Sequence, residues 1–88
     1  MATWRELITE EMEWHDETLD DVVAAAPELA TGWLDDEFHN GYGSSEGCAF
    51  TVWTTHYVYF PGVYDGKEWV ASVSRHPDGK PTKHVGGE

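Results

Sequence analysis

Residues 48–75 read CAFTVWTTHYVYFPGVYDGKEWVASVSR and contain two of the five tryptophans, three of the four tyrosines and two of the three phenylalanines. The segment is also rich in Val and Thr, whose side chains pack well on a pleated surface. This composition predicts an antiparallel β-meander. Its strands are expected at 49–54, 57–64 and 68–75, with a short fourth strand at 82–85.

Two short motifs add detail to this sheet. Asp65-Gly66 is a strong signal for a tight hairpin between the second and third strands. Pro61 falls inside the second strand and cannot donate a backbone hydrogen bond, which indicates an edge position or a β-bulge. Thr55-His56 lacks the usual chemistry of a hairpin turn, so the geometry of the first connection stays open.

The residues before the meander have a helical pattern. Thr3 and Glu6 have the spacing of a capping box, and an apolar stripe follows them. The spacing predicts a helix over residues 4–15. Its apolar face carries Trp4, Leu7, Ile8 and Met12, and another face carries Glu6, Glu10, Glu13 and Glu17.

Two further helices are predicted before the sheet. Thr18 caps an apolar stripe over residues 19–26, which Pro27 ends because the residue before proline avoids the helical conformation. A third short helix is expected after Thr31, and a loop rich in Gly and Ser follows at 39–47. The predicted fold class is therefore α+β, with two or three N-terminal helices packed on a three- to four-stranded antiparallel β-meander.

At 88 residues the chain is expected to form a single domain, because a second core would have too little apolar material. Its formal net charge is −12. Residues 1–46 carry thirteen acids and one base, whereas residues 47–88 carry four acids and four bases. The whole excess of charge therefore lies on an acidic helical half, and the half that holds the β-meander and a short tail is neutral.

Such a charge repels nucleic acid and anionic membranes and attracts basic protein surfaces. We therefore expect no direct binding to nucleic acid and no association with membranes. Carboxylates one helical turn apart, roughly 5–7 Å, approximate the spacing of phosphates along a nucleic-acid strand. The acids expected to bind a partner are Glu10, Glu13, Asp16, Glu17, Asp20, Asp21, Asp35, Asp36 and Glu37. The competing interpretation is a solvated surface that only keeps a small protein soluble.

Cys48 is the one cysteine, so the chain has no intramolecular disulfide, and a reducing cytoplasmic setting fits best. The N-terminal residues lack the basic and apolar regions of a signal peptide, and no segment approaches the roughly 18 apolar residues of a membrane span. We expect a cytoplasmic protein. The oligomeric state stays open.

The sequence does not favour catalysis, a cofactor or a metal. His15-Asp16-Glu17 offers imidazole and carboxylate ligands, but the chain has no HExxH motif, no Cys/His cluster and no complete EF-hand loop. Cys48 and the serines before it lie in no nucleophile motif, and a lone Cys at a strand start is usually a small buried residue. A non-enzymatic protein with no catalytic, cofactor-binding or metal-binding residues is predicted.

Several segments together resemble small, acidic, uncharacterised proteins of phages and other mobile elements. The segments are Thr3-Trp4-Arg5-Glu6-Leu7, Asp35-Asp36-Glu37-Phe38 with Gly41-Tyr42-Gly43, Val58-Tyr59-Phe60-Pro61, and Tyr64-Asp65-Gly66 with Glu68-Trp69-Val70. Proteins of that origin include anti-CRISPR and anti-restriction inhibitors, several of which act as nucleic-acid mimics. If a phage encodes this protein, we expect it in the host cytoplasm. The shared motifs are structural, so the resemblance assigns no functional residue.

The leading interpretation is an acidic protein that blocks a basic nucleic-acid-binding surface of a host-defence complex, as a DNA mimic does. The alternative is an acidic structural or interaction module of a phage or salt-adapted organism, which binds a protein partner through an aromatic patch on the sheet. In that case exposed aromatics such as Tyr57 would make the contact. A small metal-dependent enzyme is a third possibility.

Overall fold

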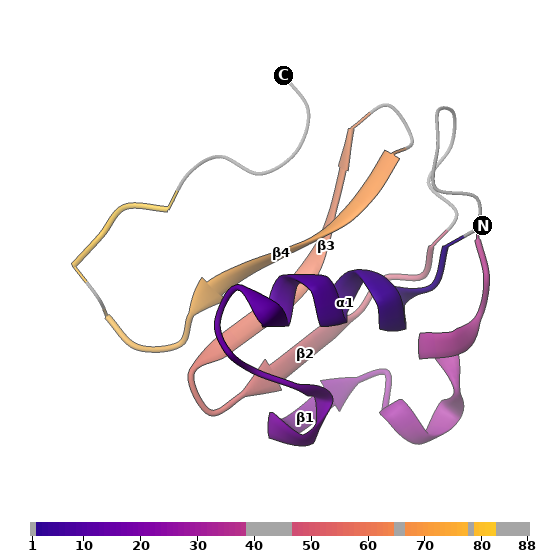
Figure 1. Cartoon of the computed structure of the whole chain (residues 1–88), viewed down its shortest axis with the longest axis horizontal. Coiled ribbons are helices and arrows are strands. Elements are labelled where there is room, and N and C mark those ends of the chain that lie inside the picture. Colours follow the sequence, from indigo (N-terminus) through magenta and orange to yellow (C-terminus); the bar gives the residue numbers. More distant parts are fainter. Residues whose placement is uncertain (1, 39–46, 65–66, 78, 83–88) are drawn as a thin grey trace.

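The computed structural model describes residues 2–38, 47–64, 67–77 and 79–82. One α-helix, α1 (Trp4–Glu13), lies across one face of a four-stranded antiparallel sheet, as Figure 1 shows. The strands are β1 (Val22–Ala26), β2 (Thr51–Thr54), β3 (Tyr57–Tyr64) and β4 (Lys67–Ser74), and they neighbour one another in chain order. The molecule measures 36 × 34 × 19 Å, and its shortest dimension matches the thickness of two layers of secondary structure.

Helix α1 starts where the capping box predicted. The Thr3 hydroxyl accepts a hydrogen bond from the backbone N–H of Glu6 at 3.3 Å. Trp4, Ile8 and Met12 are buried on one side of the helix, as the apolar stripe indicated.

The helix ends at Glu13, two residues before the predicted end, in a Schellman turn. The N–H of Glu17 bonds to the carbonyl of Met12 at 3.0 Å, and the N–H of Asp16 bonds to the carbonyl of Glu13 at 3.3 Å. Asp16 takes the left-handed conformation at φ 55° that this turn requires. The turn reverses the chain and directs Glu17 back toward the sheet.

The meander at 48–75 is confirmed, and β3 has the predicted bounds. The register pairs Tyr64 with Lys67, so two residues connect β3 and β4 as the Asp65-Gly66 signal requires. Those two residues lie outside the described part of the chain. Pro61 pairs with Val70 of β4 and lies beyond the residues of β3 that pair with β2. A missing N–H is therefore tolerated there.

The predicted helix at 19–26 is wrong. Leu19–Asp21 forms a single 3-10 turn, η1, which keeps the capping box of Thr18 and Asp21. Val22–Ala26 then forms the edge strand β1, which pairs with β2 through a bulge between Val22 and Ala24. A short run of Val and Ala fits either a helix or a strand, and pairing with β2 decides for the strand.

The predicted third helix is also shorter than expected. It is replaced by two 3-10 turns, η2 (Leu29–Thr31) and η3 (Trp33–Asp35). Gly32 separates them in the left-handed conformation at φ 86°, which prevents one continuous helix. The described part of the chain thus contains one α-helix rather than two or three, and the fold class is α+β with a four-stranded meander.

The expected fourth strand at 82–85 does not supply the fourth strand of this sheet, because β1 from the acidic half occupies that place. Thr82 is not in a strand, and residues 83–85 lie outside the described residues, as does most of the loop predicted at 39–47.

The core lies between α1 and the sheet. Its buried side chains are Trp4, Ile8, Met12, Trp33, Leu34, Phe38, Phe50, Val52, Tyr59 and Val70. The Trp4 ring contacts the rings of Phe38 and Phe50 with centroids 4.7 and 4.8 Å apart, and its Nε1 donates to the carbonyl of Cys48 at 3.0 Å. Aromatic residues from both halves of the chain thus make one core.

Candidate functional site: an acidic surface with an exposed tryptophan

The last turn of α1 and the residue after it form an acidic surface around a tryptophan. Glu10 and Glu13 are exposed, and Trp14 is 84% exposed. The three residues line a shallow depression, which we call the Trp14 site. An indole ring beside two carboxylates suits a guanidinium or ammonium group, because the ring face and both carboxylates attract a cation.

Eight of the nine acids that the sequence predicted for partner binding are exposed. They are Glu10, Glu13, Asp16, Asp20, Asp21, Asp35, Asp36 and Glu37. Two of them have local partners, since Asp21 accepts from the N–H of Thr18 at 2.8 Å and Asp35 pairs with Arg5. The structure therefore places most of the predicted set on the surface. It distributes them over α1 and several turns rather than along one helix.

Glu17 corrects the prediction of an exposed helical face. It lies after the end of α1 and is 9% exposed. Its Oε1 accepts hydrogen bonds from the hydroxyl of Tyr59 at 2.6 Å and from the hydroxyl of Thr54 at 2.9 Å. Burial, the hydrogen bond to Glu17 and the charge of that carboxylate raise the pKa of Tyr59. Glu17 is thus a structural acid that joins the Schellman turn to the sheet.

Glu11, Ser72 and His15 meet between α1 and β4. Ser72 Oγ donates to Glu11 Oε2 at 2.7 Å, and His15 Nε2 lies 2.9 Å from Ser72 Oγ. An ionised carboxylate can only accept, so the single hydroxyl proton of Ser72 points to Glu11 and His15 must donate. In a nucleophilic triad the serine donates to the histidine, which is the opposite direction. This cluster fixes the interface, and His15 also stacks on Tyr57 with centroids 3.8 Å apart.

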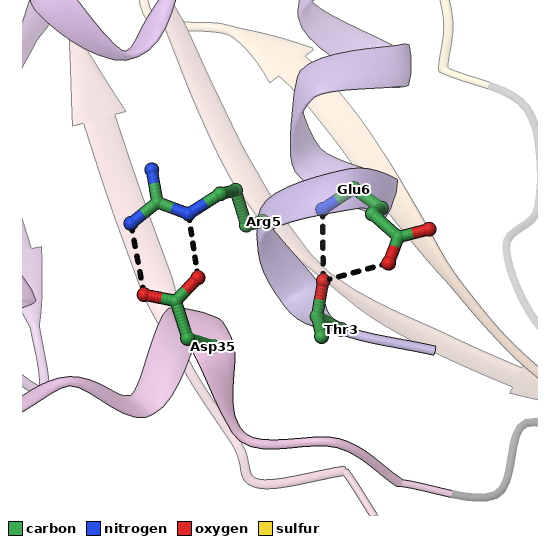
Figure 2. A network of polar contacts seen from close by, with 4 residues as sticks. All are labelled: Thr3, Arg5, Glu6 and Asp35. Carbon is green, nitrogen blue, oxygen red and sulfur yellow. Dashed lines mark hydrogen bonds and ion pairs between the residues drawn. The ribbon is translucent and has the colours of Figure 1, made fainter. Parts of the chain in front are cut away.

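An ion pair connects the start of α1 to η3, as Figure 2 shows. Arg5 Nε and Nη2 donate to the two carboxylate oxygens of Asp35 at 2.6 and 3.0 Å. The hydrogen bond from Arg5 holds the pKa of Asp35 below its ordinary value. Both side chains are exposed, so the pair orients η3 against α1 and contributes little to stability.

A second buried carboxylate was not singled out from the sequence. Glu68 is 3% exposed, and the backbone N–H of Gly47 donates to its Oε2 at 2.9 Å. A Cβ at Gly47 would lie 2.6 Å from the ring of Trp4, so only glycine fits between Trp4 and Glu68. Alternation along β4 could have indicated that Glu68 shares the face of Val70.

Cys48 is exposed and lies before β2, so the prediction of a buried small residue is wrong. Within the described ranges, no group of three or more His, Cys, Asp or Glu side chains could hold a metal ion. No helix in those ranges is long and apolar enough to cross a membrane.

Trp14 also went unnoticed in the sequence. The buried part of the apolar stripe of α1 runs through Ile8 and Met12, and position 14 falls about two turns after Leu7, at the edge of the stripe. A large aromatic residue at the edge of the stripe of an acidic helix was the available signal.

Comparison with protein-family models, curated proteins and solved structures finds no match to this chain.

Proposed function

We propose that this is a non-enzymatic acidic binding protein that blocks a basic nucleic-acid-binding surface of a host-defence complex, in the manner of anti-CRISPR or anti-restriction inhibitors. The observation that carries the proposal is the Trp14 site, where a tryptophan that is 84% exposed lines one depression with two exposed carboxylates. Nucleic-acid-binding surfaces are built from Arg and Lys, whose cationic groups this site suits.

The position of the acids supports a role beyond stability. Glu10 and Glu13 lie in the C-terminal half of α1, where negative charge opposes the helix dipole, and the last turn has no basic residue. Each such placement costs a few tenths of a kcal/mol. Glu10 and Glu13 make no hydrogen bond or ion pair with the described part of the chain. Residues that destabilise their own helix and make no compensating contact are common at functional surfaces.

Binding would work by substitution for phosphates. Glu6, Glu10 and Glu13 lie about one helical turn apart along α1, roughly 4.5–6 Å in rise. A partner that neutralises phosphates with Arg and Lys would pair with these carboxylates instead, while the Trp14 ring stacks on a guanidinium. The net charge of −12 would speed the encounter with a basic surface.

The test is a pull-down from lysate with the immobilised protein at low and high salt, with mass identification of the proteins that elute. The proposal expects nucleic-acid-binding proteins that elute with salt and are displaced by added double-stranded DNA. Captured proteins that do not bind nucleic acid, or capture that DNA does not reduce, would overturn it.

Matched charge reversals separate the Trp14 site from net charge. Glu13→Lys should strongly reduce capture, whereas Glu28→Lys makes the same change of charge at an exposed position outside the set of acids predicted to bind the partner. Equal losses from both variants would mean that only net charge matters. Glu17 is left out of the reversal set, because a lysine in its buried position would disrupt the fold.

A second candidate is the structural or interaction module that binds a protein partner through aromatic side chains of the sheet. Tyr57, the aromatic residue named for that contact, packs on His15 and against the core. The aromatic side chains that favour this candidate are instead Trp53, Phe60 and Trp69, on the face of the sheet away from α1.

A further inference from the structure

The face of the sheet away from α1 is apolar. We call it the outer sheet face, and by the strand register it comprises Ala24, Ala26, Thr51, Trp53, Val58, Phe60, Gly62, Trp69, Ala71 and Val73. None of these residues belongs to the core under α1. The 3-10 turns η1, η2 and η3 do not cover this face either. Their apolar side chains pack into or against the core on the other side of the sheet, namely Leu19, Leu29, Trp33 and Leu34.

The polarity of β4 is inverted. An antiparallel sheet with one solvated face normally places apolar residues toward the core and polar residues outward. Here the residues of β4 that face α1 are Glu68, Val70, Ser72 and Ser74, whereas the outward residues include Trp69, Ala71 and Val73. This inversion indicates that the outer sheet face is covered in the functional protein.

The outer sheet face is also closely packed within itself. Trp69 lies opposite Gly62, and a Cβ on Gly62 would be 2.7 Å from the indole ring, so the ring lies over the glycine. Phe60 lies opposite Ala71, which is buried although no helix in the described part of the chain covers it. Large side chains over small ones produce a flat surface, which is the shape that packs against another sheet.

A second copy of this chain can occupy the outer sheet face without burying an acid. All described acids lie outside this face, and the charged strand residue on the same side of the sheet is Lys67, at the hairpin end of β4. Sheets pack about 10 Å apart, and helices lie at a similar distance on sheets. In a sheet-to-sheet pair the two α1 helices would be outermost and roughly 30 Å apart, several times the Debye length of about 8 Å.

The size of the face sets the expected affinity. Strands about 4.8 Å apart and up to eight residues long give roughly 400–500 Å² per copy. A pair would bury about 800–1,000 Å², which is near the lower limit for a specific interface. A dissociation constant in the micromolar range is therefore expected.

We propose that two copies of this chain associate through the outer sheet face to form a symmetric sheet-to-sheet dimer. The pairing does not depend on the function proposed for the Trp14 site. It leaves both Trp14 sites on the outside of the pair, where each can bind.

The test is sedimentation equilibrium over a range of concentrations at low and high salt. The expected result is a monomer–dimer equilibrium that strengthens with salt, because salt screens the repulsion between two chains of charge −12. Val58→Lys, between Trp53 and Val73 on the outer sheet face, should weaken dimerisation at least about tenfold by burying an unpaired charge. Val63→Lys is the matched control on the same strand, since Val63 faces the other way and is 40% exposed.

A monomer at every concentration overturns the proposal, even if another protein binds this face. A dimer that Val58→Lys and Val63→Lys weaken equally, or not at all, overturns it too. A measurement on the unmodified chain covers the case in which Val58→Lys fails to fold. In NMR spectra, the indole N–H signals of Trp53 and Trp69 should shift with protein concentration, whereas that of Trp14 should not. The reverse pattern would place the interface on the acidic surface and refute the proposal.

Discussion

Replacing Glu17 tests the distinction between acids that hold the fold and acids that face a partner. In Glu17→Ala the hydroxyl of Tyr59, in a fully buried side chain, loses its acceptor at 2.6 Å. Thr54 keeps a weaker contact to the carbonyl of Tyr57 at 3.4 Å. A hydrogen bond to a charged group contributes about 1.5–3 kcal/mol, and an orphaned buried donor costs about 1–3 kcal/mol. We expect the free energy of unfolding to fall by about 3 kcal/mol.

Glu17→Gln should lose much less, about 1 kcal/mol. Its side-chain carbonyl can still accept from both Tyr59 and Thr54, so only the charge assistance of the two bonds is lost. Urea denaturation followed by tryptophan fluorescence measures each free energy. The matched control is Glu13→Ala, which removes the same charge from an exposed position and should stay within about 0.5 kcal/mol of the wild type.

The reasoning fails if Glu17→Ala is as stable as Glu13→Ala, because Glu17 would then be an ordinary surface acid. A double-mutant cycle with Tyr59→Phe gives a second check. The two changes share one hydrogen bond, so their free energies should differ from additivity by about 1–2 kcal/mol. Strict additivity would show that the carboxylate and the phenol do not interact.

Three further predictions follow from single positions. Asp16→Gly should raise the free energy of unfolding by about 0.5–1 kcal/mol, because glycine takes φ 55° without strain. The control Asp16→Ala removes the charge but keeps Cβ, so denaturation should show no increase in its free energy of unfolding. The raised pKa of Tyr59 means that the unfolded chain loses this proton first. Below about pH 10 this group should leave the free energy of unfolding unchanged, and above it the free energy should fall by up to about 1.4 kcal/mol per pH unit. Tyr59→Phe should remove this part of the pH dependence, as measured by denaturation at alkaline pH. Gly62→Val should displace the Trp69 ring and cost about 1–3 kcal/mol, and unchanged stability and Trp69 indole resonance would contradict the packing.

Local chemistry explains why parts of the fold could be predicted. The N-cap hydrogen bond from the N–H of Glu6 to the Thr3 hydroxyl starts α1, and a two-residue Asp-Gly signal predicts the hairpin between β3 and β4. The segment 22–26 could not be assigned the same way, because its Val and Ala satisfy a helical stripe as well as a strand. Only the pairing with β2, which is distant in sequence, decides between them.

The acidic surface could also be predicted from local spacing along the helix, with Glu17 as the exception. Exposed acids on α1 follow from helical spacing, but Glu17 lies past a left-handed turn at Asp16 that helical spacing does not include. The carboxylate therefore points to Tyr59 rather than to solvent. Aspartate is an uncommon residue at this position of a Schellman turn, so the sequence carried no glycine to indicate where the helix ends.

The orientation of the sheet could not be obtained from alternation alone. Along β4, Trp69, Ala71 and Val73 alternate with Val70, Ser72 and Ser74, and hydrophobicity would assign the first set to the core. The structure places the second set under α1 instead, where Val70 is buried in the core and Ser72 hydrogen-bonds Glu11 of the helix. The more apolar set is left on the outside.

The two surfaces of this two-layer fold should respond to salt in opposite ways. Binding at the Trp14 site depends on attraction between carboxylates and a basic partner, so added salt weakens it. Pairing through the outer sheet face depends on apolar contact between two chains of charge −12, so added salt strengthens it. One salt titration followed by both partner capture and sedimentation therefore separates the two interactions without any substitution. If both rise or fall together, the acidic layer and the apolar face are not independent surfaces, and the assignment of separate roles to them is wrong.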